Sequence, residues 1–153
     1  MGKLLNQGPD LGEKVYVRND PPMQVSEVSE LCGEARSDVD RWLDKLGAHL
    51  QHERATDEHE REIKICEATR MLTFAVRHLW MTSGILARRR RDDSAASESL
   101  VKLDQAIELM DQSIDVVTDA ARKERIRKRR ELLTELRALR EEPLAIGAPG
   151  QAL

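Results

Sequence analysis

Aromatic side chains are scarce in this 153-residue chain, where phenylalanine, tryptophan and tyrosine together make up 3% of the residues. Strands of a sheet use more aromatic and β-branched residues. A content of 40% hydrophobic and 35% charged residues is instead typical of helical bundles and coiled coils. We therefore expect an all-α protein, which at this length forms one domain around a modest hydrophobic core.

Cysteine is also rare, with Cys32 and Cys66 alone in the chain. Both fall within apolar helical patterns, and no second group of ligands makes them a redox pair or half of a zinc site. Residues 1–6 contain no apolar stretch of signal-peptide length. We expect a reduced, cytoplasmic protein.

A long uninterrupted apolar run is missing as well. The most apolar window, residues 71–87, is shorter than the ~20 residues that cross a bilayer. Arg77 and His78 lie at its centre, where a charge costs roughly 2.5–3.5 kcal/mol. We predict that this segment is a buried helix and that the protein does not enter a membrane.

A strong excess of charge is absent, because the formal net charge is −3. An argument for binding nucleic acid must therefore rest on local basic clusters. The cations of the two clusters are Arg88, Arg89, Arg90, Arg91, Arg122, Lys123, Arg125, Arg127, Lys128, Arg129 and Arg130. The cluster at residues 122–130 wraps around a helix, which suits a phosphate backbone or an acidic partner without base-specific recognition.

The five prolines lie near the two ends of the chain. Together with nearby glycines they break any helix there, so we predict a flexible, irregular arm over residues 1–23 and a flexible tail over residues 143–153. The helical bundle is expected over residues 24–142.

Two apolar patterns with alternating spacings of three and four predict helices over about residues 25–53 and 57–91. The seam of the first pattern consists of Val25, Val28, Cys32, Ala35, Val39, Trp42 and Leu46. The seam of the second consists of Ile65, Ala68, Leu72, Ala75 and Leu79. A short turn between the two makes them antiparallel neighbours.

A third apolar pattern continues beyond the length of the other two. Its seam consists of Leu100, Leu103, Ile107, Met110, Ile114, Val117 and Ala121, and it restarts at Leu132, Leu133, Leu136 and Leu139. No glycine or proline interrupts residues 95–142, so we predict one helix, on the order of 70 Å long at ~1.5 Å per residue. The predicted fold is an antiparallel three-helix bundle with this long third helix extending beyond it.

Charge is divided unevenly along the third predicted helix. Residues 92–119 carry eight acids and one lysine, whereas residues 120–142 carry nine bases and five acids. Two such helices laid antiparallel match acid to base, which fixes the orientation of a partner. Exposed apolar rows usually mark interfaces. We therefore predict a protein interface that consists of Leu132, Leu133, Leu136, Leu139, Arg137 and Arg140.

Residues for catalysis or metal binding form no convincing pattern. Serines and histidines are too scattered for a triad, and no glycine-rich phosphate loop or GxSxG turn is present. His49, His52 and His59 could converge near a predicted turn, but a zinc site also needs a fourth ligand or an open position with supporting groups. An exposed polar turn is the simpler interpretation. We expect no enzyme, no metal site and no cofactor.

Taken together, these features predict a non-enzymatic helical interaction or assembly protein. It would self-associate, as a homo-oligomer, or dock a protein partner through the C-terminal part of the third helix. The alternative hypothesis is a nucleic-acid-binding accessory factor that uses residues 122–130, with residues 88–91 as a second site. A regulator, a phage or virus assembly factor and a secretion chaperone are all compatible with the first hypothesis.

Overall fold

The computed structural model describes residues 23–51, 57–91 and 93–147, with side chains described up to residue 140. Within these ranges the chain forms four helices and no strand, which confirms the predicted all-α class. The helices are α2 (Val25–Gln51), α3 (Glu58–Arg90), α4 (Ser94–Val116) and α5 (Ala120–Gly147). The predicted N-terminal arm, except for Met23, and residues 148–153 of the predicted tail lie outside the described residues.

The first two helices form where the apolar spacing predicts them, and their seams face the core. The buried seam of α2 consists of Val28, Cys32, Ala35, Val39 and Leu46. Trp42 is half-buried and packs against the same core. On α3 the buried apolar residues include Ile65, Leu72 and Leu79, each at most 2% exposed. A period of three and four therefore identifies the inner faces of both helices.

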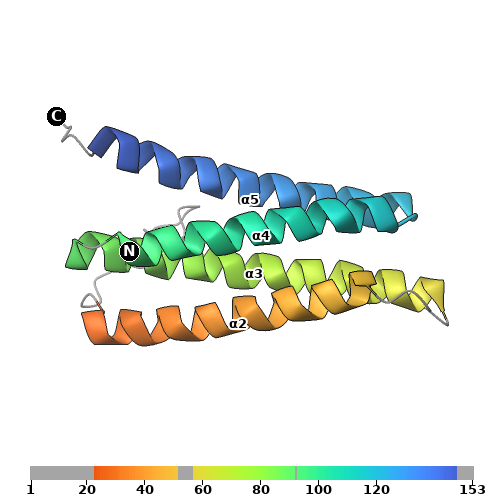
Figure 1. Cartoon of the computed structure of the whole chain (residues 1–153), viewed down its shortest axis with the longest axis horizontal. Coiled ribbons are helices and arrows are strands. Elements are labelled where there is room, and N and C mark those ends of the chain that lie inside the picture. Colours follow the sequence, from red (N-terminus) through yellow and green to blue (C-terminus); the bar gives the residue numbers. More distant parts are fainter. Residues whose placement is uncertain (1–22, 52–56, 92, 148–153) are drawn as a thin grey trace, which may run out of the picture.

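The single third helix predicted over residues 95–142 is wrong. The helix ends at Val116, and a second helix, α5, begins at Ala120 and folds back along α4. The described part of the chain is therefore a four-helix arrangement, in which neither half of the predicted third helix extends beyond the bundle (Figure 1). α5 also continues past Pro143 to Gly147, because a proline removes one helical hydrogen bond and need not end a helix near its last turn.

A sharp turn at residues 117–119, called the corner below, separates α4 from α5 and is stabilised by α3. Val117 has extended backbone angles (φ −74°, ψ 133°), which ends α4. The buried carboxylate of Glu62 on α3 accepts hydrogen bonds from the Thr118 amide (2.8 Å), the Thr118 hydroxyl (2.6 Å) and the Asp119 amide (3.4 Å). The Asp119 carboxylate accepts from the amide of Arg122 (2.9 Å) and caps α5. The amides of Thr118, Asp119 and Arg122 are thus paired at the break.

The four helices form an open arrangement around α3, which packs against each of the other three. α4 also packs against α2 and α5, so α2 and α5 lie on opposite sides of the pair formed by α3 and α4 (Figure 1). Successive helices run antiparallel, and α5 therefore runs parallel to α3. Among the described helices, this arrangement leaves part of the surface of α3 and part of that of α4 without a covering helix.

Candidate functional site

The leucines predicted as an interface lie on α5, and most of their surface is covered within the chain. Leu133 is fully buried in the core, whereas Leu136 is partly buried and packs against it. Leu132 is half-buried, and Leu139 alone is well exposed, at 52%. The expectation that these leucines form an exposed row beyond the bundle is wrong for most of them, because the corner after Val117 returns α5 to the bundle.

Acidic residues of α4 pair with basic residues of α5 in the antiparallel order that the charge distribution predicts. These pairs lie within one chain. Arg137 bonds to Asp104 (2.6 Å), and Arg130 bonds to Asp111. Seven residues separate the two bases, as they do the two acids, so the pairs form a ladder along the helices. Exposed pairs of this kind contribute about 0.2–1 kcal/mol each, so the ladder specifies orientation more than stability.

The basic segment at residues 122–130 is largely engaged in docking α5. Arg122 lies 3.7 Å from the Glu62 carboxylate. Arg129 donates to the Cys66 carbonyl (3.0 Å) and to the Thr69 hydroxyl (3.0 Å) on α3. Lys123 is half-buried, and the cations of the segment that remain exposed are Arg125, Arg127 and Lys128. The segment therefore presents fewer free cations than its sequence indicates.

Arg129→Ala is expected to lower the free energy of unfolding by about 1–2 kcal/mol. The substitution removes two hydrogen bonds that join α5 to the buried residues Cys66 and Thr69 of α3. Arg125→Ala is the matched control on the same helix, because Arg125 is exposed, and it should change stability by less than about 0.5 kcal/mol. Urea unfolding followed by circular dichroism measures both. Equal effects of the two substitutions would show that the bonds of Arg129 do not hold α5 on α3.

The other basic cluster, Arg88 to Arg91, occupies the C-terminal end of α3. All four side chains are exposed, and Arg89 donates to the carbonyl of Met23 ahead of α2. Arg91 adopts a left-handed conformation (φ 53°) that caps α3. Because Arg122 lies beside Glu62 near the start of α3, the two basic clusters are at opposite ends of the molecule.

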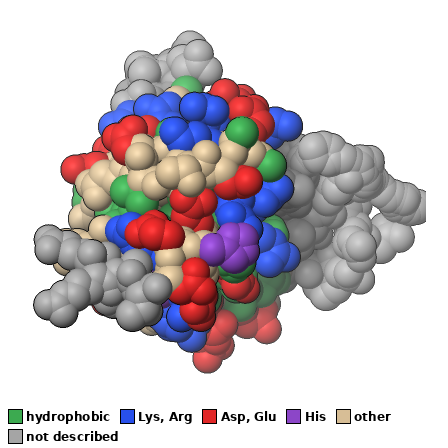
Figure 2. All heavy atoms as spheres, turned by 90° about the vertical axis from the view of Figure 1, so that its right-hand side faces the viewer, with side chains coloured by type: hydrophobic (Ala, Val, Ile, Leu, Met, Phe, Trp, Pro, Cys, Tyr) green, Lys and Arg blue, Asp and Glu red, His purple; other side chains and the backbone are tan. Residues whose placement is uncertain are grey.

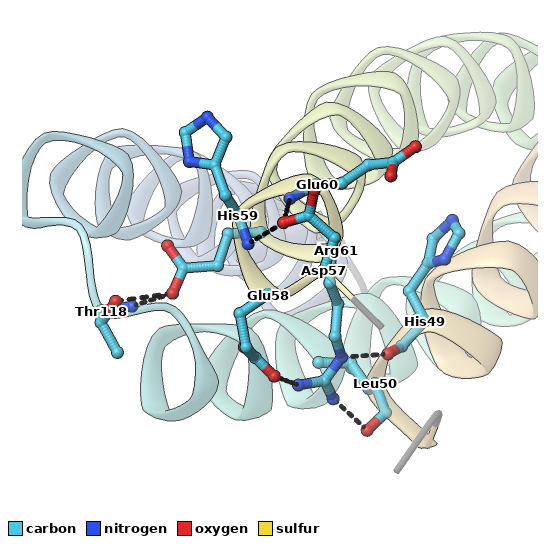
Figure 3. A network of polar contacts seen from close by, with 9 residues as sticks. His49, Leu50, Asp57, Glu58, His59, Glu60, Arg61 and Thr118 are labelled. Carbon is cyan, nitrogen blue, oxygen red and sulfur yellow. Dashed lines mark hydrogen bonds and ion pairs between the residues drawn. The ribbon is translucent and has the colours of Figure 1, made fainter. Parts of the chain in front are cut away.

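The end of the molecule at which α2 leads into α3 is polar. Acidic and basic side chains are interspersed over it, with a histidine among them (Figure 2). Arg61 donates to the carbonyls of His49 (3.0 Å) and Leu50 (2.9 Å) and so pairs the last carbonyls of α2. The rings of His49 and His59 point in different directions (Figure 3). His52 lies outside the described residues, and the described ones contain no group of three or more metal-binding side chains.

The uncovered face of α3 combines apolar and basic side chains. This α3 outer face consists of Ile63, Glu67, Arg70, Phe74, Arg77 and Met81, at alternating spacings of four and three. Phe74 is 51% exposed and Ile63 is 41% exposed. The guanidinium of Arg70 lies 5.4 Å from the centre of the Phe74 ring, a cation–π distance that orders both side chains at the surface.

The outward side of α4 is acidic, and two of its acids, Asp104 and Asp111, pair with Arg137 and Arg130 of α5. This α4 outer face consists of Val101, Asp104, Glu108, Asp111 and Asp115, at alternating spacings of three and four. Val101 is 56% exposed. α3 and α4 pack against each other through other residues, so the two outer faces are separate surfaces. Three of the four exposed large hydrophobic residues in the described part of the chain lie on these two faces.

Sequence reasoning missed both outer faces as candidate surfaces, since it assigned the chain's exposed apolar row to the leucines of residues 132–139. The available signal is the apolar residues on α3 at positions outside its core seam, Ile63 and Phe74 above all. No helix in the described ranges is both long and apolar enough to cross a membrane.

A scan of the chain against protein-family models matches no family, and searches among curated proteins and among solved structures give no significant match.

Proposed function

We propose that the protein is a non-enzymatic helical assembly protein that self-associates, with the α3 outer face of one copy against the α4 outer face of the next. One observation supports this most directly: each of the two outer faces exposes at least one large apolar side chain, and the two differ in charge. The α3 outer face has two arginines and one glutamate. The α4 outer face has four acids, of which Asp104 and Asp111 pair with α5, so that Glu108 and Asp115 are the two left for a partner.

The charges that would act between copies are free of partners within the described chain. Glu108 and Asp115 are exposed and form no hydrogen bond or ion pair with a described residue. Among the described residues Arg70 contacts the Phe74 ring and forms no hydrogen bond or ion pair, so its N–H groups are available there. Complementary charges of this kind accelerate association and select the orientation of the partner.

A contact between two different faces of the same molecule is heterologous, so each copy keeps one free face of each kind. Such a contact produces a ring if the rotation closes and an open chain of copies if it does not. This contact replaces the leucine seam of α5 as the proposed interface, because most of that seam packs inside the molecule.

Reversing the charge of one face is expected to prevent assembly, and reversing both is expected to restore it. The variant Arg70→Glu with Arg77→Glu places acids opposite acids and should weaken association on the order of 100-fold. Adding Glu108→Arg and Asp115→Arg to the same chain makes the faces complementary again. Light scattering after size exclusion, over a range of protein and salt concentrations, measures the mass.

The controls for this experiment use the same chain. Arg125→Glu with Lys128→Glu changes charge by the same amount on α5 and should leave the mass of the assembly unaltered. A wild-type protein that stays monomeric at all concentrations would contradict self-association. If the fourfold variant has native helix content but does not assemble, that result would contradict the pairing of these two faces.

Nucleic-acid binding by residues 122–130 has less support, because Arg122, Arg129 and Arg130 of that segment are bound within the chain. The same size-exclusion run tests it through the ratio of absorbance at 260 and 280 nm. Excess absorbance at 260 nm that disappears with the Arg125→Glu and Lys128→Glu control would favour it over the self-association proposal.

A further inference from the structure

The guanidinium of Arg140 is buried in a cluster that contains no described carboxylate. Arg140 is 8% exposed, and its guanidinium stacks on the ring of Trp80 at 4.7 Å. It donates to the hydroxyls of Ser83 (3.3 Å) and Ser99 (3.2 Å) and to the carbonyl of Trp80. All these acceptors are neutral, and no ion pair to a described acid is formed. Buried arginines are ordinarily paired with an anion.

A second cation approaches the same point above Gly84. A Cβ atom built on Gly84 would lie 2.8 Å from Nη2 of Arg140 and 3.7 Å from Nη1 of Arg88. Both guanidinium groups therefore meet over a residue without a side chain. Arg88 is exposed and forms no hydrogen bond or ion pair with a described residue. Any larger residue at position 84 would occupy the space between the two cations.

The cluster has more hydrogen-bond donors than acceptors. The three bonds of Arg140 use three of its five N–H groups. The indole Nε1 of Trp80 is buried and has no partner among the described residues. Burial, and secondarily the charge of Arg88, lower the pKa of Arg140 to about 10. An anion between the two arginines would accept from free N–H groups, and its charge would stabilise both guanidinium groups and oppose that shift.

We propose that Arg88 and Arg140 form a binding site for one oxyanion, a phosphate or carboxylate group, held over Gly84 at the C-terminal end of α3. The planar guanidinium fork matches both kinds of oxyanion. The group can come from free phosphate or from an acidic side chain of a binding partner, since both present the same oxygens. This inference does not depend on the self-association of the two outer faces.

Inorganic phosphate is the probe for the first experiment, on the full chain. At constant ionic strength, replacing chloride by phosphate should raise the melting temperature of the wild-type protein with saturation. In Arg88→Gln, which alters only an exposed side chain, the midpoint of that rise should shift at least tenfold to higher phosphate. Arg125→Gln is the matched control and should behave as wild type. A parallel series with acetate distinguishes carboxylate from phosphate as the preferred oxyanion.

A second measurement observes the site directly. In a Trp42→Phe variant, Trp80 is the only tryptophan, and its fluorescence should change with phosphate because its ring stacks on Arg140. The change should saturate at the same phosphate concentration as the thermal effect and weaken with Arg88→Gln. A rise in melting temperature that is equal in wild type and Arg88→Gln, without a saturable fluorescence change, would overturn the proposal.

Discussion

Glu62→Ala is expected to lower the free energy of unfolding by about 3 kcal/mol and to loosen α5 from the other helices. The carboxylate of Glu62 accepts from the Thr118 amide and hydroxyl and from the Asp119 amide. A hydrogen bond to a charged group contributes about 1.5–3 kcal/mol, and removal of this one acceptor leaves several donors of the corner unpaired. Urea unfolding gives the stability, and hydrogen exchange of the α5 amides shows the loosening.

Glu34→Ala is the matched control, because Glu34 is an exposed glutamate on α2 that forms no described ion pair. It should change stability by less than about 0.5 kcal/mol. If Glu62→Ala destabilised the protein no more than Glu34→Ala, the corner after Val117 would be held by packing alone and not by the buried carboxylate.

The stability that Glu62 contributes should depend on pH. Burial raises the pKa of Glu62, but the hydrogen bonds from Thr118, then that from Asp119, and the charge of Arg122 outweigh it and leave the pKa below the ordinary 4.5. Because the folded-state pKa is depressed, the contribution is complete above the unfolded-state pKa of about 4.5 and is lost as the pH falls through the lower folded-state value. Glu62→Gln should remove this part of the acid sensitivity.

Leu133→Ala should cost about 3 kcal/mol of stability, because Leu133 is a fully buried side chain in the core. The cost is the sum of two contributions: the free energy of transfer from water that the removed atoms no longer supply, and the free energy of the cavity that they leave. Leu139→Ala changes a side chain that is 52% exposed on the same helix, and the expected cost is less than about 1 kcal/mol.

The two leucine variants also distinguish a role in the core from a role in an interface between copies. If the leucines of α5 formed an interface between copies, both substitutions would change the mass of the assembly at low protein concentration and leave the unfolding of the monomer nearly unaltered. Because α5 folds back onto the core, Leu133→Ala should instead lower the midpoint of unfolding. At denaturant concentrations below that midpoint, the variant should keep the native mass.

The inner faces of α2 and α3 can be predicted from the sequence because their buried apolar residues recur with the period of a helix. Val28, Cys32 and Ala35 repeat with the period of a helix, and every one of them is buried. The same reasoning applied to residues 95–142 predicts a single helix, because the spacing continues and no glycine or proline interrupts it.

The corner could not be derived from the apolar spacing. Residues 116–119, Val-Val-Thr-Asp, are all weak helix formers, and this is the local signal that a search for glycine and proline omits. What stabilises the break is Glu62, on another helix and 56 positions earlier in the chain than Thr118. A determinant at that distance is a property of the tertiary fold.

The charge distribution illustrates the same limit. Acids over residues 92–119 and bases over residues 120–142 predict antiparallel pairing correctly, as Asp104 with Arg137 shows. Charge complementarity does not distinguish pairing within one chain from pairing between two chains. The pairing is intramolecular because the chain turns back after Val117. Arg140 has no local signal at all, since its partners Trp80, Ser83 and Ser99 come from two other helices.

The most direct test of the fold-back is a distance between α4 and α5. Spin labels at Gln105→Cys and Thr134→Cys, both exposed positions, would be introduced with Cys32→Ala and Cys66→Ala and diluted into unlabelled protein. Packed antiparallel helices place the labels about 20 Å apart or less. A continuous helix places the two positions about 44 Å apart at ~1.5 Å per residue. A single short distance supports the four-helix fold, and a distance near 44 Å contradicts it.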